Sequence, residues 1–438
     1  MRTNGKKTEM TLPISELFKI DAELEEPFTH LGIGPMSPLI IKAAFELAEE
    51  LKFPLFFIAS RNQIDSYSLG GGYVQGWNQE QFSTEVRRIA TSVGFTGIYY
   101  LCRDHGGPWQ KDTEFKAGLD STKATQCALT SFSEDIASGF EFLHVDTSVD
   151  PEFGRLTPAA LATDRVVSII ESLEEIASKS GGGVCYEASL EESNGDFSVV
   201  EEFRRFVTLL ASSLNDRGLP LPVYMVGNTG TLTKMNRNIG KFDVSVIKAL
   251  AKICLDNGMI LKEHNADYLS GEVLAQHPYL GIGMANVAPE FGYAETRALL
   301  ELEEEERFYI ESGESNSLKA SGLKDAFLSE ILKSDKWKKW LTPEMKNMSK
   351  EELFQSAGFV NDIVLVNGHY HFSSERVEQA RLNLYQNATK MNPNGGSSVG
   401  ETSVKDAIKA SIRRYVESFN LIGHTEKVMS VAGCHADV

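Results

Sequence analysis

A short apolar run followed by a loop and a longer stretch of helical periodicity recurs between residues 30 and 300. The runs are continuous rather than alternating, which is typical of parallel strands covered on both faces. They cover residues 30–34, 54–60, 97–102, 141–146, 183–187, 221–226, 259–263 and 279–284. Eight such units over this length predict an α/β fold, a (β/α)8 TIM barrel, with a doubly wound open sheet as the alternative.

The alternation ends after residue 306, and the remaining sequence predicts helices. We therefore divide the chain into an amino-terminal segment (1–29), a barrel (30–306) and a mainly helical carboxy-terminal extension (307–438). We expect this extension to be a lid or an oligomerisation element, and the chain to form a homo-oligomer. Three sites carry helix-start signals: Ser37 before a proline, Thr157 before a proline, and Ser198 three residues before Glu201.

Composition excludes several partners. The formal charge of −18 disfavours nucleic acid, which binds cationic surfaces. We expect no membrane span and a cytoplasmic location, because the apolar runs are far shorter than about 20 residues and the amino terminus lacks an apolar leader pattern. The run KWKKW at 336–340 predicts an amphipathic surface helix with buried tryptophans.

Imidazole and carboxylate side chains gather where the predicted strands end. Asp104 and His105 follow the third run, Asp146 ends the fourth, Glu187 ends the fifth, and His264 follows the seventh. Each could simply cap a helix, but barrel enzymes place their chemistry at the carboxyl ends of the strands. We predict a site for a divalent metal, Zn²⁺ or Mn²⁺, with His105, Glu187 and His264 as its ligands.

Other polar residues near these strand ends are candidates for substrate contacts. Asn62, Asn228 and Asn286 could orient hydroxyl groups, and Asp267 could orient His264, whereas Arg61 and Arg103 could bind a phosphate or carboxylate. Two further features stay open. His144 suits either a core position or the site, and His369 and His371 suit either an ordinary turn or a group reaching over the mouth. The glycine-rich stretch 69–73 after the second run could let backbone amides approach an anion.

The order of these motifs resembles the GatZ/KbaZ family, the Z-type subunits of class II D-tagatose-1,6-bisphosphate aldolase. The stretches that carry the resemblance lie between about residues 31 and 300. They are SPLIIKAA at 37–44, SRNQ at 60–63, GGY at 71–73, DHGGP at 104–108, HVDTS at 144–148, Glu187, HNADY at 264–268 and GIG at 281–283.

The resemblance implies a TIM barrel of the class II aldolase superfamily. In that superfamily an Asp-His pair supplies an acid/base aspartate and a metal-binding histidine, and Asp104-His105 is similar to that pair. The chemistry expected is reversible cleavage of the C3–C4 bond, or C4 epimerisation, of a ketohexose or ketohexose phosphate, with Asp104, Asp146 and Glu187 as catalytic residues. The resemblance equally implies an alternative, a non-catalytic subunit that stabilises a separate class II aldolase chain.

A sugar-phosphate kinase is the weakest alternative. The sequence contains neither G-x-x-x-x-G-K-[ST] nor G-x-G-x-x-G, the patterns that cradle nucleotide phosphates.

Overall fold

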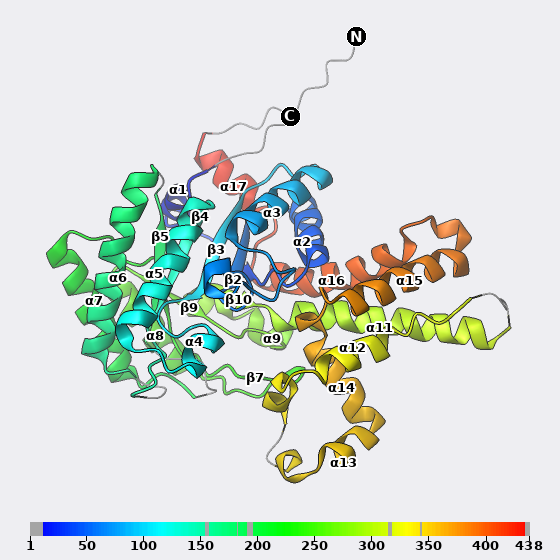
Figure 1. The fold of residues 1–438 in the computed structure, drawn as a ribbon. Coiled ribbons are helices and arrows are strands. Elements are labelled where there is room, and N and C mark those ends of the chain that lie inside the picture. Colours follow the sequence, from blue (N-terminus) through cyan, green and yellow to red (C-terminus); the bar gives the residue numbers. More distant parts are fainter. Residues whose placement is uncertain are drawn as a thin grey trace.

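The computed structural model describes residues 12–153, 157–181, 183–190, 196–313, 318–341 and 344–433, so residues 12–29 of the predicted amino-terminal segment are included. Eight parallel strands close into a barrel (Figure 1), which confirms the predicted TIM barrel and excludes the open sheet. The strands in barrel order are β1 (His30–Ile33), β2 (Leu55–Ser60), β3 (Tyr99–Gly106), β4 (Phe140–Asp146), β5 (Cys185–Ser189), β6 (Tyr224–Val226), β9 (Ile260–Glu263) and β10 (Ile282–Val287).

Helices surround the barrel and continue into the extension. Between the strands lie α2 (Pro38–Leu51), α3 (Gln79–Val93), α4 (Asp112–Lys116), α5 (Ser121–Ala137), α6 (Ala159–Ser180), α7 (Val200–Arg217), α8 (Val244–Asp256), α9 (Gly271–Leu274) and α10 (His277–Leu280). After the barrel follow α11 (Pro289–Glu311), α12 (Leu323–Ile331), α13 (Lys350–Gln355), α14 (Ala357–Asn367), α15 (Glu375–Met391), α16 (Val399–Ser418) and α17 (His424–Val431). Short 3-10 helices are η1 (Tyr67–Leu69), η2 (Lys336–Trp340), η3 (Met345–Asn347), η4 (Gly368–Tyr370) and η5 (Pro393–Gly395). Within the described residues, none of these helices is long and apolar enough to cross a membrane.

One of the three predicted helix caps is confirmed. Ser37 accepts a hydrogen bond from the Ile40 amide, and Pro38 opens α2. The other two predictions were wrong. Thr157 donates its hydroxyl to the carbonyls of Thr147 and Ser148, and Ser198 accepts from the amide of Asn228, so tertiary partners use both hydroxyls. Residues 336–340 form η2 rather than an α-helix, with Trp337 buried as expected.

Most strand boundaries differ from the prediction by a few residues, and two of the differences concern the eighth and third strands. The eighth strand begins at Ile282 rather than 279, because Pro278 lies in the short helix α10 and Gly281 ends that helix at a φ of +81°. The third strand continues to Gly106 instead of ending at 102, so Asp104 and His105 belong to the strand itself. The position of Asp104 is therefore fixed by sheet register, since it pairs with Ser60 of β2.

A helix closes the amino-terminal end of the barrel. Leu17 and Ile20 of α1 (Ile14–Asp21) pack in one buried cluster with Phe56, Tyr100 and Tyr224, which project from early positions of their strands. Helix α17 packs against α1, and Figure 1 shows both at the end of the barrel opposite the β7 (Thr233–Lys234) and β8 (Arg237–Asn238) hairpin. This arrangement leaves the carboxyl ends of the strands as the mouth.

The extension completes the ring of helices. Helix α16 lies against α2 and α11, and ion pairs join it to α2: Lys42 with Glu401, Lys405 with Glu46, and Arg413 with Glu50. At the mouth, the β7–β8 hairpin is tied down by Asn238, whose amide donates to the carbonyls of Asn265 and Asp267 at 3.0 Å each. Helices α13 and α14 lie on the mouth side in Figure 1.

Candidate functional site

Four side chains from neighbouring strands converge inside the mouth. Asp104 comes from β3, His144 from β4, Glu187 from β5, and His264 follows β9, and one ligand atom of each lies within 4.8 Å of the others. His144 Nδ1 lies 3.1 Å from Glu187 Oε1. His264 Nε2 lies 3.7 Å from Glu187 Oε1 and 3.7 Å from Asp104 Oδ1. We call these four residues the mouth cluster. His144 therefore lies at the site, one of the two positions that the sequence left open.

Two buried atoms of this cluster lack hydrogen-bond partners among the described residues. They are Glu187 Oε1 and His264 Nε2, which face each other at a distance too long for a hydrogen bond. Burial lowers the pKa of His264 to about 4, so the ring is neutral near pH 7. A neutral imidazole and a carboxylate oxygen, held close without a hydrogen bond between them, are typical metal ligands. The residues present therefore fit a divalent cation.

A buried lysine holds the opposite oxygen of Glu187. Lys262 of β9 donates to Glu187 Oε2, and both side chains are 1% exposed. The lysine nitrogen also lies 5.3 Å from the centre of the Phe142 ring. Burial alone would raise the pKa of Glu187, but the charge of Lys262 lowers it to about 2. The carboxylate is thus kept ionised, with Oε1 turned towards the two histidines.

An asparagine supports the cluster from the neighbouring strand. Asn286 of β10 donates to Asp104 Oδ1 at 3.0 Å. A methyl group at Gly32 of β1 would lie 2.2 Å from Asn286 Oδ1, so the absence of a side chain there makes room for the amide. Asn286 was predicted as a site residue, and the structure brings it to Asp104.

His105 points to a different partner. Its Nδ1 lies 2.6 Å from Asp146 Oδ2, and 37% of its side chain is exposed at the mouth. Asp146 Oδ1 also accepts from the Ser148 amide and the Ser189 hydroxyl. Burial would raise the pKa of Asp146, but the hydrogen bond from His105 and the charge of His144 hold it well below its ordinary value. The pair of His105 and Asp146 resembles an oriented acid/base group. It lies next to the mouth cluster, since the ring centres of His105 and His264 are 4.8 Å apart.

Comparison with known proteins finds a family match for one part of the chain. Residues 23–184 match the model of the family described as D-tagatose-1,6-bisphosphate aldolase subunit GatZ/KbaZ-like. Over these residues, which are less than half of the chain, the sequence is similar to the GatZ/KbaZ-like family. The match includes Asp104, His105, His144 and Asp146 and ends just before Glu187. The resemblance predicted from the motifs is confirmed.

Solved structures show the same fold. A probable tagatose 6 phosphate kinase from Sinorhizobium meliloti 1021 is 20% identical, with 89% of this chain and 100% of that chain covered and a TM-score of 0.70. The fructose-bisphosphate aldolase Fba from Campylobacter jejuni is 12% identical, with 93% and 94% covered and a TM-score of 0.54. No curated protein sequence matches the chain.

The two predicted arginines are buried and already paired. Arg61 donates to Glu114 and to the carbonyl of Gly107, and Arg103 donates two hydrogen bonds to Asp135, at 2.8 and 2.5 Å. Both guanidinium groups lie inside the protein. A substrate oxyanion would have to displace these carboxylates, so we leave both arginines out of the proposed site.

Three other predicted residues stabilise loops around the mouth. Asn62 bonds to the carbonyl of Gln110 and the amide of Asp112. Asp267 accepts from the amides of Ala288 and Glu290 at the start of α11, instead of contacting His264, and burial raises its pKa to about 7. Asn228 is buried, and its backbone amide donates to the Ser198 hydroxyl. Within the described residues, no hydrogen bond joins Asn62 or Asp267 to the four-residue cluster.

A second buried histidine pair lies at the closed end of the barrel. Asp21 of α1 uses one oxygen for His30 Nε2 at 2.7 Å and the other for His424 Nε2 at 2.8 Å. These are hydrogen-bond distances to separate oxygens, so the cluster is complete without an ion and ties α1 and α17 to β1. Sequence spacing gave no signal for it, because its members are 9 and 403 residues apart.

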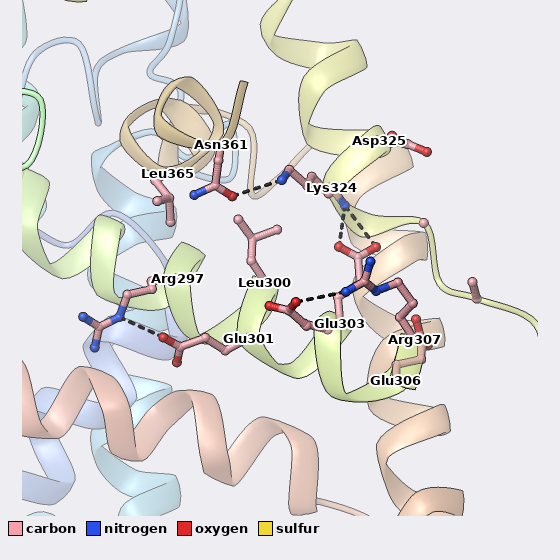
Figure 2. Close-up of a pocket in the computed structure, with 13 residues that line it drawn as sticks. Arg297, Leu300, Glu301, Glu303, Glu306, Arg307, Lys324, Asp325, Asn361 and Leu365 are labelled. Carbon is pink, nitrogen blue, oxygen red and sulfur yellow. Dashed lines mark hydrogen bonds and ion pairs between the residues drawn. The ribbon is translucent and has the colours of Figure 1, made fainter. Parts of the chain in front are cut away.

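The extension contains a separate pocket of about 610 Å³ between α11, α12 and α14 (Figure 2). Its charged groups largely pair with one another: Arg297 with Glu301, Arg307 with Glu304, and the Lys324 amide with Glu303. None of the mouth residues lines this pocket. We therefore place the candidate site at the mouth.

Proposed function

We propose that this chain is a divalent-metal-dependent enzyme that cleaves and re-forms the C3–C4 bond of a ketohexose or ketohexose phosphate, as an aldolase or a 4-epimerase. The observation that carries the proposal is the pair of buried, unpartnered ligand atoms, Glu187 Oε1 and His264 Nε2, beside Asp104 and His144. The family match to a D-tagatose-1,6-bisphosphate aldolase subunit supports the same reaction class.

Asp104, Glu187 and His264 would hold the cation. His144 lies beside them, with Nδ1 accepting from the His105 amide and Nε2 hydrogen-bonded to Ser189. A bound Zn²⁺ or Mn²⁺ supplies a Lewis acid that polarises the ketose carbonyl and stabilises the negative charge developing as the bond breaks. Lys262 keeps Glu187 ionised and turned towards the ion, and Asn286 orients Asp104 in the same way.

Proton transfer falls to His105. Its partly exposed ring would take the proton of the C4 hydroxyl at Nε2, because Asp146 holds its Nδ1. If the aldehyde re-adds on its other face, the imidazolium would return the proton to the C4 oxygen; if the aldehyde leaves, C3 of the other fragment would take up a proton instead. This assignment exchanges the roles expected from sequence for Asp104 and His105. His105 also offers a ring nitrogen within 4.8 Å of ligand atoms of His144 and His264, but its Nδ1 is hydrogen-bonded to Asp146, whereas the Asp104 carboxylate lies beside the unpartnered atoms of Glu187 and His264.

A screen of the purified chain tests this proposal. The protein is loaded with Zn²⁺ or Mn²⁺ and assayed on ketohexoses and their phosphates for C4 inversion and for cleavage. We expect turnover that disappears in Asp104→Asn and Glu187→Gln. Absence of bound metal together with absence of turnover would overturn the proposal.

The similarity to a family of aldolase subunits favours a second function, the stabilisation of a separate class II aldolase chain. Copurification with such a chain, and no activity from the isolated protein, would support it. Activity of the isolated chain that is lost in Asp104→Asn would exclude it.

A further inference from the structure

The extension places two lysines and a histidine around a pair of tyrosines. Lys336 and Lys339 lie in η2, His369 and Tyr370 lie in η4, and Tyr73 lies in the loop after β2. We call these five residues the rim cluster. The Lys336 nitrogen lies 5.7 Å from the Tyr73 ring centre and 5.4 Å from the Tyr370 ring centre. Lys339 donates to the Tyr370 hydroxyl at 2.5 Å.

Hydrogen bonds connect the rim cluster to the end of β2. Tyr73 is hydrogen-bonded to Gln63, and Gln63 Oε1 accepts from the Ser60 amide at 2.8 Å. Ser60 is the residue of β2 that pairs with Asp104 of β3. Tyr73 is therefore linked through two side-chain contacts to the strand position beside the mouth cluster.

The other side of the rim cluster rests on the first turn of α11. A methyl group at Gly292 would lie 2.6 Å from the His369 Cβ and 2.9 Å from the end of Met36, which follows β1. His369 therefore packs where the loops after β1 and β10 meet. Those loops follow the carboxyl ends of the strands, so both contacts put the cluster on the rim of the mouth.

The two lysines carry uncompensated charge. Among the described residues neither forms an ion pair with a carboxylate, whereas Lys338 between them pairs with Asp335 at 2.9 Å. Instead, both ammonium groups face the tyrosine rings, which attract cations through the negative charge of the ring face. In a chain with a formal charge of −18, this is a local concentration of positive charge.

His369 adds a buried polar group without a recorded partner. His369 is 3% exposed, and its Nδ1 has no hydrogen bond within the described part of the chain. Burial, and then the nearby charge of Lys339, lower the pKa of His369 to about 3. A buried ring nitrogen without a partner costs free energy unless a ligand or water satisfies it.

We propose that the rim cluster binds a phosphate-type oxyanion, with Lys336 and Lys339 supplying charge and His369 an N–H donor. The cluster contains lysines and no arginine, and lysine binds phosphate as a point charge, whereas planar carboxylates favour the arginine fork. This oxyanion site would add a phosphate contact to the proposed reaction, and its role in substrate binding rests on that proposed function. If the mouth cluster binds the ketose carbonyl, the extension binds the charged end of the same substrate.

Calorimetric titration of the full chain with inorganic phosphate tests the site. EDTA is included so that phosphate does not bind a metal at the mouth. We expect saturable binding by the wild type and an increase in Kd of about tenfold or more for Lys336→Ala/Lys339→Ala. Lys338→Ala is the matched control, because it removes the same charge from the same exposed helix, and its Kd should match that of the wild type. Equal binding by all three proteins, or none by the wild type, would overturn the proposal.

Glucuronate in place of phosphate tests the chemistry of the ligand. Weaker binding of glucuronate supports a phosphate-type site, and binding as tight as that of phosphate would overturn that assignment. These titrations need neither metal nor turnover. Failure of the oxyanion site can therefore be distinguished from failure of the proposed reaction.

Discussion

Lys262 and Glu187 form an ion pair inside the barrel, where each side chain is 1% exposed. The pair joins β9 to β5 across the interior and leaves one carboxylate oxygen directed at the histidines of the mouth cluster. Removing one member of a buried pair leaves the other charge uncompensated, which is more costly than replacing both.

We therefore predict that Lys262→Met destabilises the fold by about 3–5 kcal/mol, measured by urea unfolding. The double variant Lys262→Met/Glu187→Gln should recover much of that free energy while still failing to bind metal. An unfolding curve for Lys262→Met that coincides with the wild type would contradict this interpretation of the pair.

Replacement of a proposed ligand should remove the metal. His264→Asn is expected to weaken Zn²⁺ binding by more than the roughly 10–100-fold that loss of an outer partner costs, because a nitrogen facing Glu187 Oε1 disappears. Equilibrium dialysis followed by elemental analysis measures this. His30→Asn is the control, since His30 belongs to the hydrogen-bonded cluster at the closed end of the barrel, and it should leave the metal content unchanged.

His105→Gln separates proton transfer from metal binding. Because His105 is paired to Asp146 and partly exposed, we expect the variant to keep its metal and to lose about 10²–10⁴-fold in kcat on the ketose found by the screen. Metal loss comparable to that of His264→Asn would instead make His105 a ligand, as the sequence first suggested.

Much of the architecture could be predicted because its signals are local. Each strand is a short apolar run, and Ser37 with Pro38 is a cap formed within four residues of chain. His144 also had a local signal, since Phe142, His144 and Asp146 alternate along β4 and share one face of the strand. That alternation favours the site over an isolated core position.

Long-range pairing could not be predicted in the same way. Arg61 is paired to Glu114 and Arg103 to Asp135, partners 53 and 32 residues away, so no local pattern distinguishes these structural arginines from substrate-binding ones. Lys262 was missed for a related reason. A lysine near the end of a strand is usually exposed, and only the register of β5, β6 and β9 turns it inward against Glu187.

Gly107 should tolerate no side chain. Its φ of +140° disfavours other residues, and an added methyl group would lie 2.0 Å from the carbonyl oxygen of Asp146. We expect Gly107→Ala to cost more than about 3 kcal/mol in urea unfolding, because backbone rather than a side chain must move. Gly118→Ala is the control: its φ is +62° with open space around it, so strain of about 1 kcal/mol is expected. Similar losses for both variants would contradict the proposed backbone clash.

Glu295 of α11 should make stability fall as the pH rises. Its fully buried carboxyl accepts from the Ser37 hydroxyl at 2.5 Å, and burial raises its pKa from 4.5 to about 7 despite the opposing charge of Arg381. Between these values the folded protein keeps a proton that the unfolded chain releases. The free energy of unfolding should therefore decline by roughly 1.4 kcal/mol per pH unit across this window, up to about 3 kcal/mol, and level off above pH 7.

Urea unfolding at pH 5, 6 and 8 measures this slope. Glu295→Gln should lower the slope by roughly 1.4 kcal/mol per pH unit, because the amide stays neutral at every pH, and the variant should gain on the wild type as the pH rises. The contribution of Asp267, whose pKa burial also raises to about 7, should persist. Glu301→Gln is the matched control on the same helix, where the side chain is 64% exposed and the slope should persist. Parallel pH profiles for the wild type and Glu295→Gln would mean that this carboxyl is ionised in the folded protein, and that Arg381 and Ser37 offset its burial.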